Sequence, residues 1–145
     1  MAALSARLAA IVAALPLREG MRVLEIGCGA GAMARAMAAR IGDGQVLGID
    51  RSAKAVALAI AGSVDAIAAG RLAFRQSAVE IFERAPGEPP FDLAVAIRVG
   101  VLDGRHPARE AEALRRIAAA LAPGAALYLD GGDPLRCLTP RGAAV

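Results

Sequence analysis

One short stretch near the N-terminus constrains the fold of this chain more than any other: residues 23–31 have the sequence VLEIGCGAG. Apolar residues at positions 23, 24 and 26 predict a buried strand, and three alternate glycines end it. Residues 30–41, which follow, are typical of a helix. Glycine is needed where a Cβ would block a ligand's approach to the backbone or where φ must be positive. A strand, a glycine loop and a helix in this order predict an α/β protein that holds a nucleotide-like ligand at the loop.

Strand and helix signals alternate along the rest of the chain. Strands are predicted at residues 22–26, 45–50, 72–76, 91–97 and 125–130. Helices are predicted at residues 3–15, 30–41 and 52–70, in a short stretch at 79–84, and from Pro107 to Pro123. Strands separated by helices form parallel, right-handed βαβ units. We therefore expect one domain over residues 1–145, a three-layer α/β sandwich. Its Rossmann-like, mostly parallel sheet of about five strands would carry helices on both faces.

The N-terminal segment needs its own interpretation, because Arg7 and the apolar run after it could begin a secretory signal peptide. Its apolar residues share one helical face: Leu4, Leu8, Ile11, Val12 and Leu15. No clear small-residue cleavage site precedes Arg18. This pattern favours a helix that covers the sheet. No uncharged apolar run approaches the roughly 18 residues that a membrane span requires, so no membrane partner is expected.

Charge and cysteine content narrow the classes of partner. The net charge is +3, from scattered arginines with a single lysine, and no basic run exceeds Arg115-Arg116. Aromatic residues, which could stack on bases, make up only 3% of the chain. This composition favours a solvated surface over a nucleic-acid groove. Cys28 and Cys137 lack the spacing of a metal site, so no metal is expected. Their separation favours a reducing, cytoplasmic compartment over a disulfide framework.

The glycines alone leave the ligand open between two classes. Gly27, Gly29 and Ala32 also fit the dinucleotide fingerprint G-x-G-x-x-G/A. Asp50 lies about where that motif places its ribose-binding acid. The acidic neighbour of the loop is more specific. Glu25, two residues before the first glycine, favours a ligand with a cationic group and would repel a pyrophosphate.

Two further segments follow the glycine loop at characteristic separations. Phe91-Asp92 opens the fourth strand, and LAPGA at residues 121–125 precedes the fifth. With the glycine loop and Asp50, they resemble the class I S-adenosylmethionine-dependent methyltransferases. That family has V-L-D/E-I/V/L-G-x-G-x-G at the first strand, an acid ending the second, F-D-x-I/V opening the fourth and L-K/A/R-P-G-G before the fifth. The resemblance covers about residues 17–130. It implies S-adenosylmethionine as cofactor, S-adenosylhomocysteine as product, and methyl transfer to an acceptor, here a small molecule.

The resemblance implies cofactor-binding roles for a set of residues around the loop and the strand ends. They are Glu25, Gly27, Cys28, Gly29, Gly31, Asp50, Arg51, Ser77, Ala78 and Arg98. The backbone of the glycines would approach the methionine portion, and Glu25 would help to hold its ammonium group. Cys28 would contribute its N–H and otherwise be a small packing residue. Asp50 would accept hydrogen bonds from both ribose hydroxyls, and Arg51 would line the adenine edge.

Some of these assignments have structural alternatives. The family often has an acid and a small residue at the position of Ser77-Ala78, so adenine recognition here would be weaker or shared with Glu80. Arg98 is expected either in the cleft or in a surface ion pair. Glu25 could instead be a partly exposed acid at a strand end, and Asp50 a turn or cap residue.

No catalytic constellation stands out in the sequence, and the candidates for a general base are weak. His106, the single histidine, lies in the loop after the fourth strand, where the family often places acceptor-side residues. It would act as a base with Asp103 orienting it. Alternatively, it only precedes and caps a helix that Pro107 opens. The family's N-P-P-Y/F tetrapeptide is replaced by IRVG at residues 97–100, which disfavours base or glutamine methylation.

The C-terminal part departs from the family's pattern. In the family, the sheet usually continues with a helix and an antiparallel pair of strands. Only fifteen residues follow Asp130, and they include Pro134 and Pro140, which disfavour a central strand. We therefore expect that pair to be missing and residues 131–145 to form a loose tail. The fifth strand would then be an exposed edge, covered by the tail or by a second copy in a homodimer.

Two other interpretations compete with a methyltransferase. The absent catalytic constellation and the shortened sheet leave open a non-catalytic, cofactor-binding module that serves as a partner subunit. An NAD-dependent oxidoreductase would require a separate substrate domain and a catalytic Tyr-Lys, Cys or His set. The chain has one tyrosine, Tyr128, which its pattern places in the fifth strand, and too few residues for a second domain.

Overall fold

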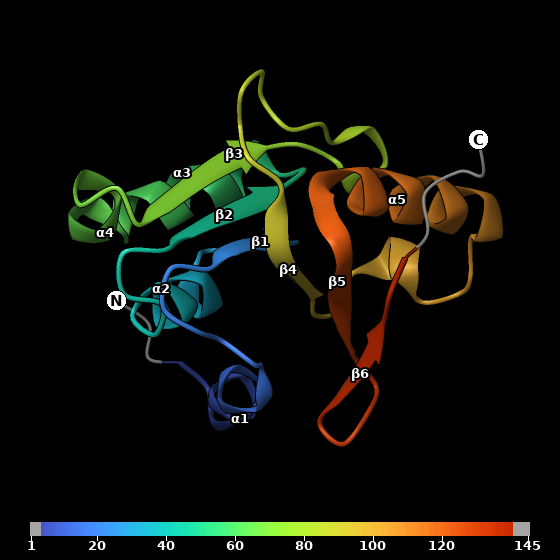
Figure 1. The fold of residues 1–145 in the computed structure, drawn as a ribbon, viewed down its shortest axis with the longest axis horizontal. Coiled ribbons are helices and arrows are strands. Elements are labelled where there is room, and N and C mark those ends of the chain that lie inside the picture. Colours follow the sequence, from blue (N-terminus) through green and yellow to red (C-terminus); the bar gives the residue numbers. More distant parts are fainter. Residues whose placement is uncertain (1–3, 141–145) are drawn as a thin grey trace.

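The computed structural model of the chain describes residues 4–140 and contains one six-stranded sheet flanked by helices (Figure 1). The sheet has the strand order β3-β2-β1-β4-β5-β6. The strands are β1 Arg22–Ile26, β2 Gln45–Asp50, β3 Leu72–Gln76, β4 Phe91–Ala96, β5 Leu121–Asp130 and β6 Leu135–Leu138. The helices are α1 Ala6–Ala14, α2 Ala32–Ala38, α3 Ala53–Ala61, α4 Val64–Ala68 and α5 Pro107–Ala120, with short 3-10 turns η1 Val79–Ile81 and η2 Gly100–Leu102. Strands β1 to β5 pair in parallel, which confirms the predicted α/β, mostly parallel architecture.

The core consists of two layers, because side chains alternate between the faces of each strand. On one face, Val23 and Val46 pack in a cluster with buried residues of α1 and α2. On the other face, Leu24 and Leu127 pack with buried residues of α5 and η1. Both faces of the parallel sheet are thus covered, and its strands are apolar on both sides. The carboxyl ends of the strands, where such sheets bind ligands, remain accessible.

Helix α1 forms where the amphipathic N-terminal segment predicts a covering helix. Ser5 caps it, because its Oγ accepts the N–H of Leu8 at 3.2 Å. Ile11 and Val12 are buried against the sheet. Residue 3, at which this helix is expected to begin, lies outside the described residues. No helix among residues 4–140 is long and apolar enough to cross a membrane.

The C-terminal edge of the sheet differs from the prediction. Strand β6 pairs antiparallel with β5, with Tyr128 opposite Cys137, so the antiparallel pair is present. Pro134 and Pro140 lie just outside this strand, which is at the sheet edge and needs hydrogen bonds on one side only. Residues 135–138 therefore are not a loose tail, and residues 141–145 lie outside the described part. Because β5 is not bare, the reason for expecting a homodimer does not hold.

The long helix predicted over residues 52–70 is also wrong in detail. It is divided into α3 and α4 at Gly62 and Ser63. Arg35, on α2, donates from Nη1 to the buried Oγ of Ser63 at 3.0 Å. This contact between distant segments stabilises the break between the two helices. The alanine-rich sequence on both sides of the break favours helix, so the break was not predicted.

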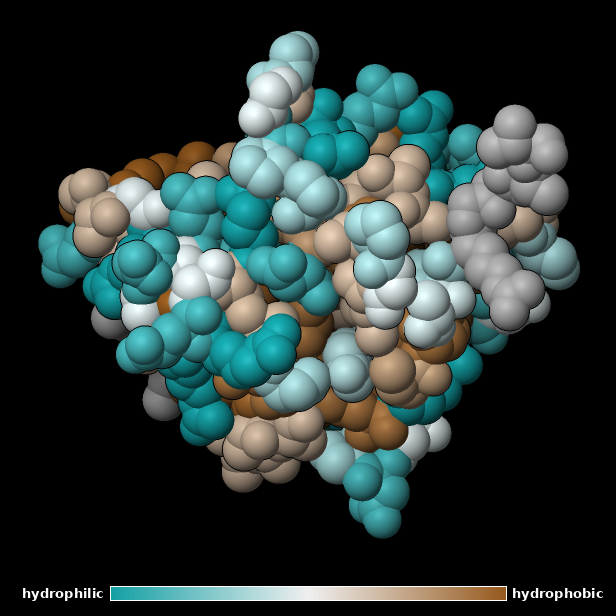
Figure 2. Space-filling view, in the orientation of Figure 1, coloured by the Kyte–Doolittle hydropathy of each residue, from teal (hydrophilic) through white to brown (hydrophobic). Residues whose placement is uncertain are grey.

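Large hydrophobic side chains are exposed on α3 and α4. They are Leu58, Ile60 and Val64, of which Val64 is 66% exposed. Figure 2 shows hydrophobic surface along the margin over α3, whereas polar residues cover much of the rest of this face. None of the three residues lines either of the two cavities described below.

Candidate functional site

The glycine loop between β1 and α2 is held by backbone conformations that favour glycine. Gly27 has φ +71°, and a Cβ there would lie 2.9 Å from Cγ2 of Val99, which follows β4. Gly31 has φ +88°, and its Cβ would lie 2.9 Å from Cζ of Phe74 on β3. The loop therefore packs closely on both sides. Gly27 faces the cavity at the strand ends, whereas Gly31 is required by packing against the neighbouring layer.

Asp50, at the end of β2, is bonded to the glycine loop. Its Oδ2 accepts the N–H of Gly29 at 2.9 Å, and its Oδ1 accepts the N–H of Ser52 at 2.9 Å. These bonds orient the carboxylate, and each oxygen keeps a lone pair that can accept from a ligand. Asp50 lines the cavity, so a hydroxyl-bearing ligand could reach it.

Glu25 lies beneath the loop, on β1. It is only 4% exposed, and its Oε1 has no hydrogen-bond partner among residues 4–140. Burial and, secondarily, the negative charge of Asp50 raise the pKa of Glu25 to about 8. Burial, followed by the charges of Glu25 and Asp50, likewise raises the pKa of Cys28 to about 12, which disfavours the thiolate form at neutral pH. A buried carboxyl oxygen without a partner is unfavourable unless a ligand supplies one.

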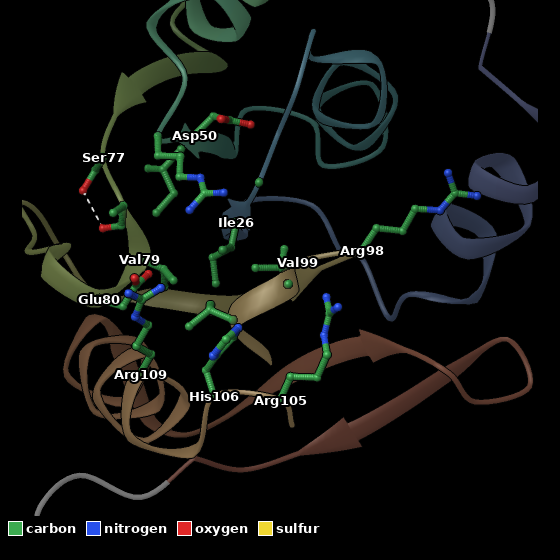
Figure 3. A pocket seen from close by; sticks show the side chains of 16 residues that line it. Ile26, Asp50, Ser77, Val79, Glu80, Arg98, Val99, Arg105, His106 and Arg109 are labelled. Atoms are coloured by element: carbon green, nitrogen blue, oxygen red, sulfur yellow. Dashed lines mark hydrogen bonds between the residues drawn. The ribbon is translucent and has the colours of Figure 1, made fainter. Parts of the chain in front are cut away.

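A cavity of about 390 Å³ lies at the carboxyl ends of β1 to β4 (Figure 3). Six of the predicted cofactor residues line it: Gly27, Asp50, Arg51, Ser77, Ala78 and Arg98. The other four, Glu25, Cys28, Gly29 and Gly31, lie around the loop but not in the lining. Most of the predicted set thus surrounds one space, although the members come from four separate strand ends.

The adenine-side residues form their own local bonds. Oγ of Ser77 donates to the carbonyl oxygen of Ala78 at 2.9 Å, and the N–H of Ser77 donates to the carbonyl oxygen of Asp50 at 3.0 Å. The second bond joins the ends of β2 and β3. Glu80, in the η1 turn, lines the same cavity, so an acidic side chain is present in the lining together with Ser77.

His106 lines the cavity, but Asp103 does not orient it. Asp103 instead accepts from Nε of Arg105 at 2.7 Å and from its N–H at 3.0 Å, and these bonds lower the pKa of Asp103. His106 occupies the N-cap position of α5, yet its side chain makes no capping bond; its carbonyl oxygen accepts the N–H of Glu110. The structure therefore contains neither the proposed pair nor a side-chain cap.

Arg98 is held in an unusual backbone conformation at the border between this cavity and a second one. Its φ is +58°, and its N–H donates to Oδ1 of Asp130 at 3.2 Å. The other oxygen of Asp130 lies 3.3 Å from Nη2 of Arg7, on α1. A non-glycine residue with positive φ costs roughly 1–2 kcal/mol, which this contact helps to offset. In Figure 3 the side chain of Arg98 points away from the centre of the cavity.

A second cavity, of about 430 Å³, adjoins the first at the carboxyl ends of β4 and β5. The two cavities share four lining residues: Arg98, Val99, Gly100 and Arg105. Asp103, Asp130 and Arg136 line the second cavity alone. The segment between β4 and α5 is therefore a common wall.

Two of the arginines that line the first cavity were not singled out from the sequence. Arg105 and Arg109 line the first cavity, from the loop before α5 and from its first turn. The available signal was that the two arginines lie four residues apart, just before α5 and in its first turn. It is weak, because arginines at such positions usually face solvent.

The comparisons with known proteins agree with this geometry. A model of the family described as "Methyltransferase domain" matches residues 23–124. The chain belongs to this methyltransferase domain family. Among curated proteins, none matches it.

Solved structures with the same fold include proteins of more than one named activity. A SAM-dependent methyltransferase from Thiobacillus denitrificans, in complex with S-adenosyl-L-homocysteine, is 25% identical, with a TM-score of 0.68 over 88% of this chain and 48% of that one. The Haemonchus contortus phosphoethanolamine N-methyltransferase 2, in complex with S-adenosyl-L-methionine, is 27% identical, with a TM-score of 0.67 over 85% and 27%. The cyclase SpnF is 29% identical, with a TM-score of 0.69 over 85% and 43%. The family member described here spans no more than about half the length of these proteins.

Proposed function

We propose that this chain binds S-adenosylmethionine at the carboxyl ends of β1 to β4 and transfers its methyl group to a small-molecule acceptor. The observation that carries the proposal is the buried, unpartnered Oε1 of Glu25, two residues before Gly27. An ammonium group at the loop would satisfy this oxygen, whereas a pyrophosphate would bring further negative charge to it. Membership of the methyltransferase domain family, and two similar structures with S-adenosylmethionine or its product, support the same cofactor.

Different residues around the cavity would contact different parts of the cofactor. Glu25 would hold the ammonium group, and the backbone at Gly27 would lie against the methionine portion. Asp50, oriented by the N–H of Gly29, would accept from the ribose hydroxyls. Ser77 and Ala78, with Glu80 nearby in the lining, would contact the adenine. Arg51 would lie along the adenine edge.

When bound, S-adenosylmethionine supplies a methyl group on a sulfonium, which leaves as a neutral thioether once the acceptor's electron pair has displaced it. The chain contributes mainly by position, because holding an acceptor in line with the methyl group can supply much of the acceleration. Val99, packed against Gly27, helps to exclude water from this point. If the acceptor carries a proton, His106 is the candidate to take it at an imidazole nitrogen, without help from Asp103.

Calorimetric titration with S-adenosylmethionine, S-adenosylhomocysteine and NAD tests the cofactor. We expect the first two to bind with Kd in the micromolar range and NAD not to bind. Asp50→Ala should weaken binding by at least about 30-fold, roughly 2 kcal/mol, because two hydrogen bonds to a charged group are lost. Asp50→Asn keeps an acceptor for Gly29 and controls for loop disorder, and Asp43→Ala, on an exposed turn, should bind normally. Binding of NAD alone, or of none of the three compounds, contradicts the proposal.

A non-catalytic, cofactor-binding module is the second candidate. One observation favours it: Asp103 is bonded to Arg105 rather than to the single histidine. Formation of S-adenosylhomocysteine in the presence of an acceptor panel separates the two candidates. Tight cofactor binding with no turnover on any acceptor would favour the module.

Two further parts of the proposal concern assembly and location. We propose a cytoplasmic location, which the free thiols of Cys28 and Cys137 support. A homodimer that pairs through the C-terminal edge of the sheet would use β6, the outermost strand there, rather than β5. Light scattering over a range of protein concentrations tests for this homodimer, and a constant monomer mass would contradict it.

A further inference from the structure

The second cavity lies where a methyl acceptor would have to bind. It adjoins the first cavity through the wall that contains Val99 and Gly100. An acceptor must reach the methyl group from the side opposite the sulfur, so it needs a space next to the cofactor site. The second cavity, at the ends of β4 and β5, provides such a space of about 430 Å³.

Arginines dominate the charge of this cavity. Arg98, Arg105 and Arg136 line it, against Asp103 and Asp130. Both carboxylates are already engaged: Asp103 with Arg105, and Asp130 with Arg7 of α1 and the N–H of Arg98. The guanidinium groups therefore exceed the carboxylates that could neutralise them.

Two of these arginines retain donors for a ligand. Arg136 donates from Nε to the carbonyl oxygen of Asp130 at 3.3 Å, and its Nη atoms have no partner among residues 4–140. Arg105 meets Asp103 through Nε and Nη2 and keeps Nη1 free. Its side chain is 75% exposed, so it can exchange Asp103 for another anion at little cost. An arginine fork suits a carboxylate or a phosphate group.

The cofactor does not account for this positive charge. S-adenosylmethionine has a single carboxylate beside its sulfonium and ammonium cations, and four arginines already line the first cavity: Arg51, Arg98, Arg105 and Arg109. Arg136, moreover, lines only the second cavity, on the far side of the shared wall. A second, negatively charged ligand is what this arrangement fits.

We infer that the second cavity binds the anionic group, a carboxylate or a phosphate, of a small-molecule acceptor, and that Arg105 and Arg136 hold it. The assignment of this ligand as the acceptor rests on the proposed function. The presence of the anion site does not. In the free chain Arg105 is paired with Asp103, and the anionic group of the ligand displaces the Asp103 carboxylate from Arg105.

The test uses NMR titration of the whole chain, observing the Nε–Hε resonances of arginine side chains. The probes are benzoate and phenyl phosphate, with benzyl alcohol as the neutral counterpart, all at 150 mM sodium chloride to screen loose association. We expect saturable shifts at Arg105 and Arg136 with Kd of about 1–20 mM for the anions, and none with benzyl alcohol. The stronger binder of the two anions distinguishes a carboxylate site from a phosphate site.

Two matched variants should change the affinity for the anion in opposite directions. Arg105→Gln should weaken anion binding at least fivefold. Asp103→Asn should tighten it about threefold, because the competing carboxylate is gone. Arg115→Gln, which removes an arginine paired with Glu112 on α5, should change nothing. Shifts of equal size at Arg115, absence of saturation, or weaker binding in Asp103→Asn would overturn the inference.

Repeating the titration on protein saturated with S-adenosylhomocysteine separates this inference from the proposed function. Retained shifts place the anion beside the cofactor, as expected. Loss of the shifts would mean that the arginines hold the cofactor's own carboxylate, which overturns the inference and leaves the function standing. If S-adenosylhomocysteine does not bind, the proposed function fails, and the titration of the free chain still decides whether the anion site exists.

Discussion

The protonation of Glu25, a residue of the candidate site, should make the stability of the folded chain depend on pH. Burial and the charge of Asp50 raise the pKa of Glu25 from its ordinary value of about 4.5 to about 8. Between these pH values the folded chain holds a proton that the unfolded chain has released. The stabilising contribution is therefore complete below the unfolded pKa and is lost as the pH rises through the folded pKa.

Replacing Glu25 by glutamine should remove this dependence. Relative to Glu25→Gln, the unfolding free energy of the natural chain should fall by up to about 1.4 kcal/mol per pH unit between pH 5 and 8. Urea denaturation of both proteins at a series of pH values measures the difference. Parallel pH profiles would show that Glu25 titrates normally.

The same carboxyl group predicts proton release when the cofactor binds. At pH 7 Glu25 is mostly protonated in the free chain, and an ammonium group beside it would lower its pKa. Binding should therefore release up to about one proton. Calorimetry of S-adenosylhomocysteine in phosphate and in Tris buffer detects this as a buffer-dependent enthalpy. Glu25→Gln should abolish the dependence, and its persistence would assign the proton to another group.

Gly31 and Gly70 form a matched pair for separating backbone strain from packing. Both have positive φ, +88° and +76°, but only at Gly31 would a Cβ meet neighbours within 4 Å, with Cζ of Phe74 at 2.9 Å. Gly70→Ala should cost roughly 1–2 kcal/mol, the penalty for a left-handed alanine. Gly31→Ala should cost about 1–3 kcal/mol more, because the core is overpacked. Thermal unfolding measures both, and equal losses would mean that Phe74 moves aside freely.

At the scale of elements, Asp130 joins three parts of the molecule that meet beside the second cavity. It lies at the end of β5, pairs with Arg7 of α1 and accepts the N–H of Arg98 after β4. Asp130→Ala should cost about 1–3 kcal/mol, because the N–H of Arg98 loses its partner in a strained conformation. Arg7→Ala should cost under about 1 kcal/mol, since an exposed ion pair contributes little. Hydrogen exchange should be faster over residues 98–106 in the first variant and unchanged in the second; equal protection in both would contradict this role.

The elements that the sequence predicts correctly have a local signal, and those that it misses do not. Strands β1 to β4 are short apolar runs bounded by turns, so their period and length are sufficient. Strand β6 is half-exposed and four residues long, and only pairing with β5 stabilises it. The division between α3 and α4 depends on Arg35 of α2, a partner 28 residues before Ser63. Neither feature has a counterpart in the local pattern.

In the candidate site, too, some features could be predicted from the sequence and others could not. Gly27, Asp50 and Ser77 lie at strand ends, where parallel topology gathers them without further information. Asp103 and His106 are near each other in sequence, yet Arg105 takes the carboxylate. Choice of partner within a loop depends on side-chain rotamers and on solvent, which the order of residues does not encode.

At the scale of the whole molecule, the two cavities and the wall between them form one continuous ligand-binding surface. The residues proposed to bind the cofactor lie at the ends of β1, β2 and β3. The arginines of the second cavity lie after β4, on β6 and in the loop before α5. Binding at either cavity therefore acts on the segment from Arg98 to Arg105. A rigid strand framework holds the glycine loop, whereas this segment consists of a 3-10 turn and irregular chain.

Because both cavities share this wall, we expect the binding of the two ligands to be thermodynamically linked. If S-adenosylhomocysteine changes the affinity for benzoate by some factor, benzoate must change the affinity for S-adenosylhomocysteine by the same factor. We expect a coupling of about 5-fold or more, roughly 1 kcal/mol, measured as a calorimetric titration in each order. Independent affinities would show that the wall does not respond to its ligands. With coupling, the eight residues from Arg98 to Arg105 would report each ligand to the other, so that sensing whether both reactants are present would require no hinge between domains.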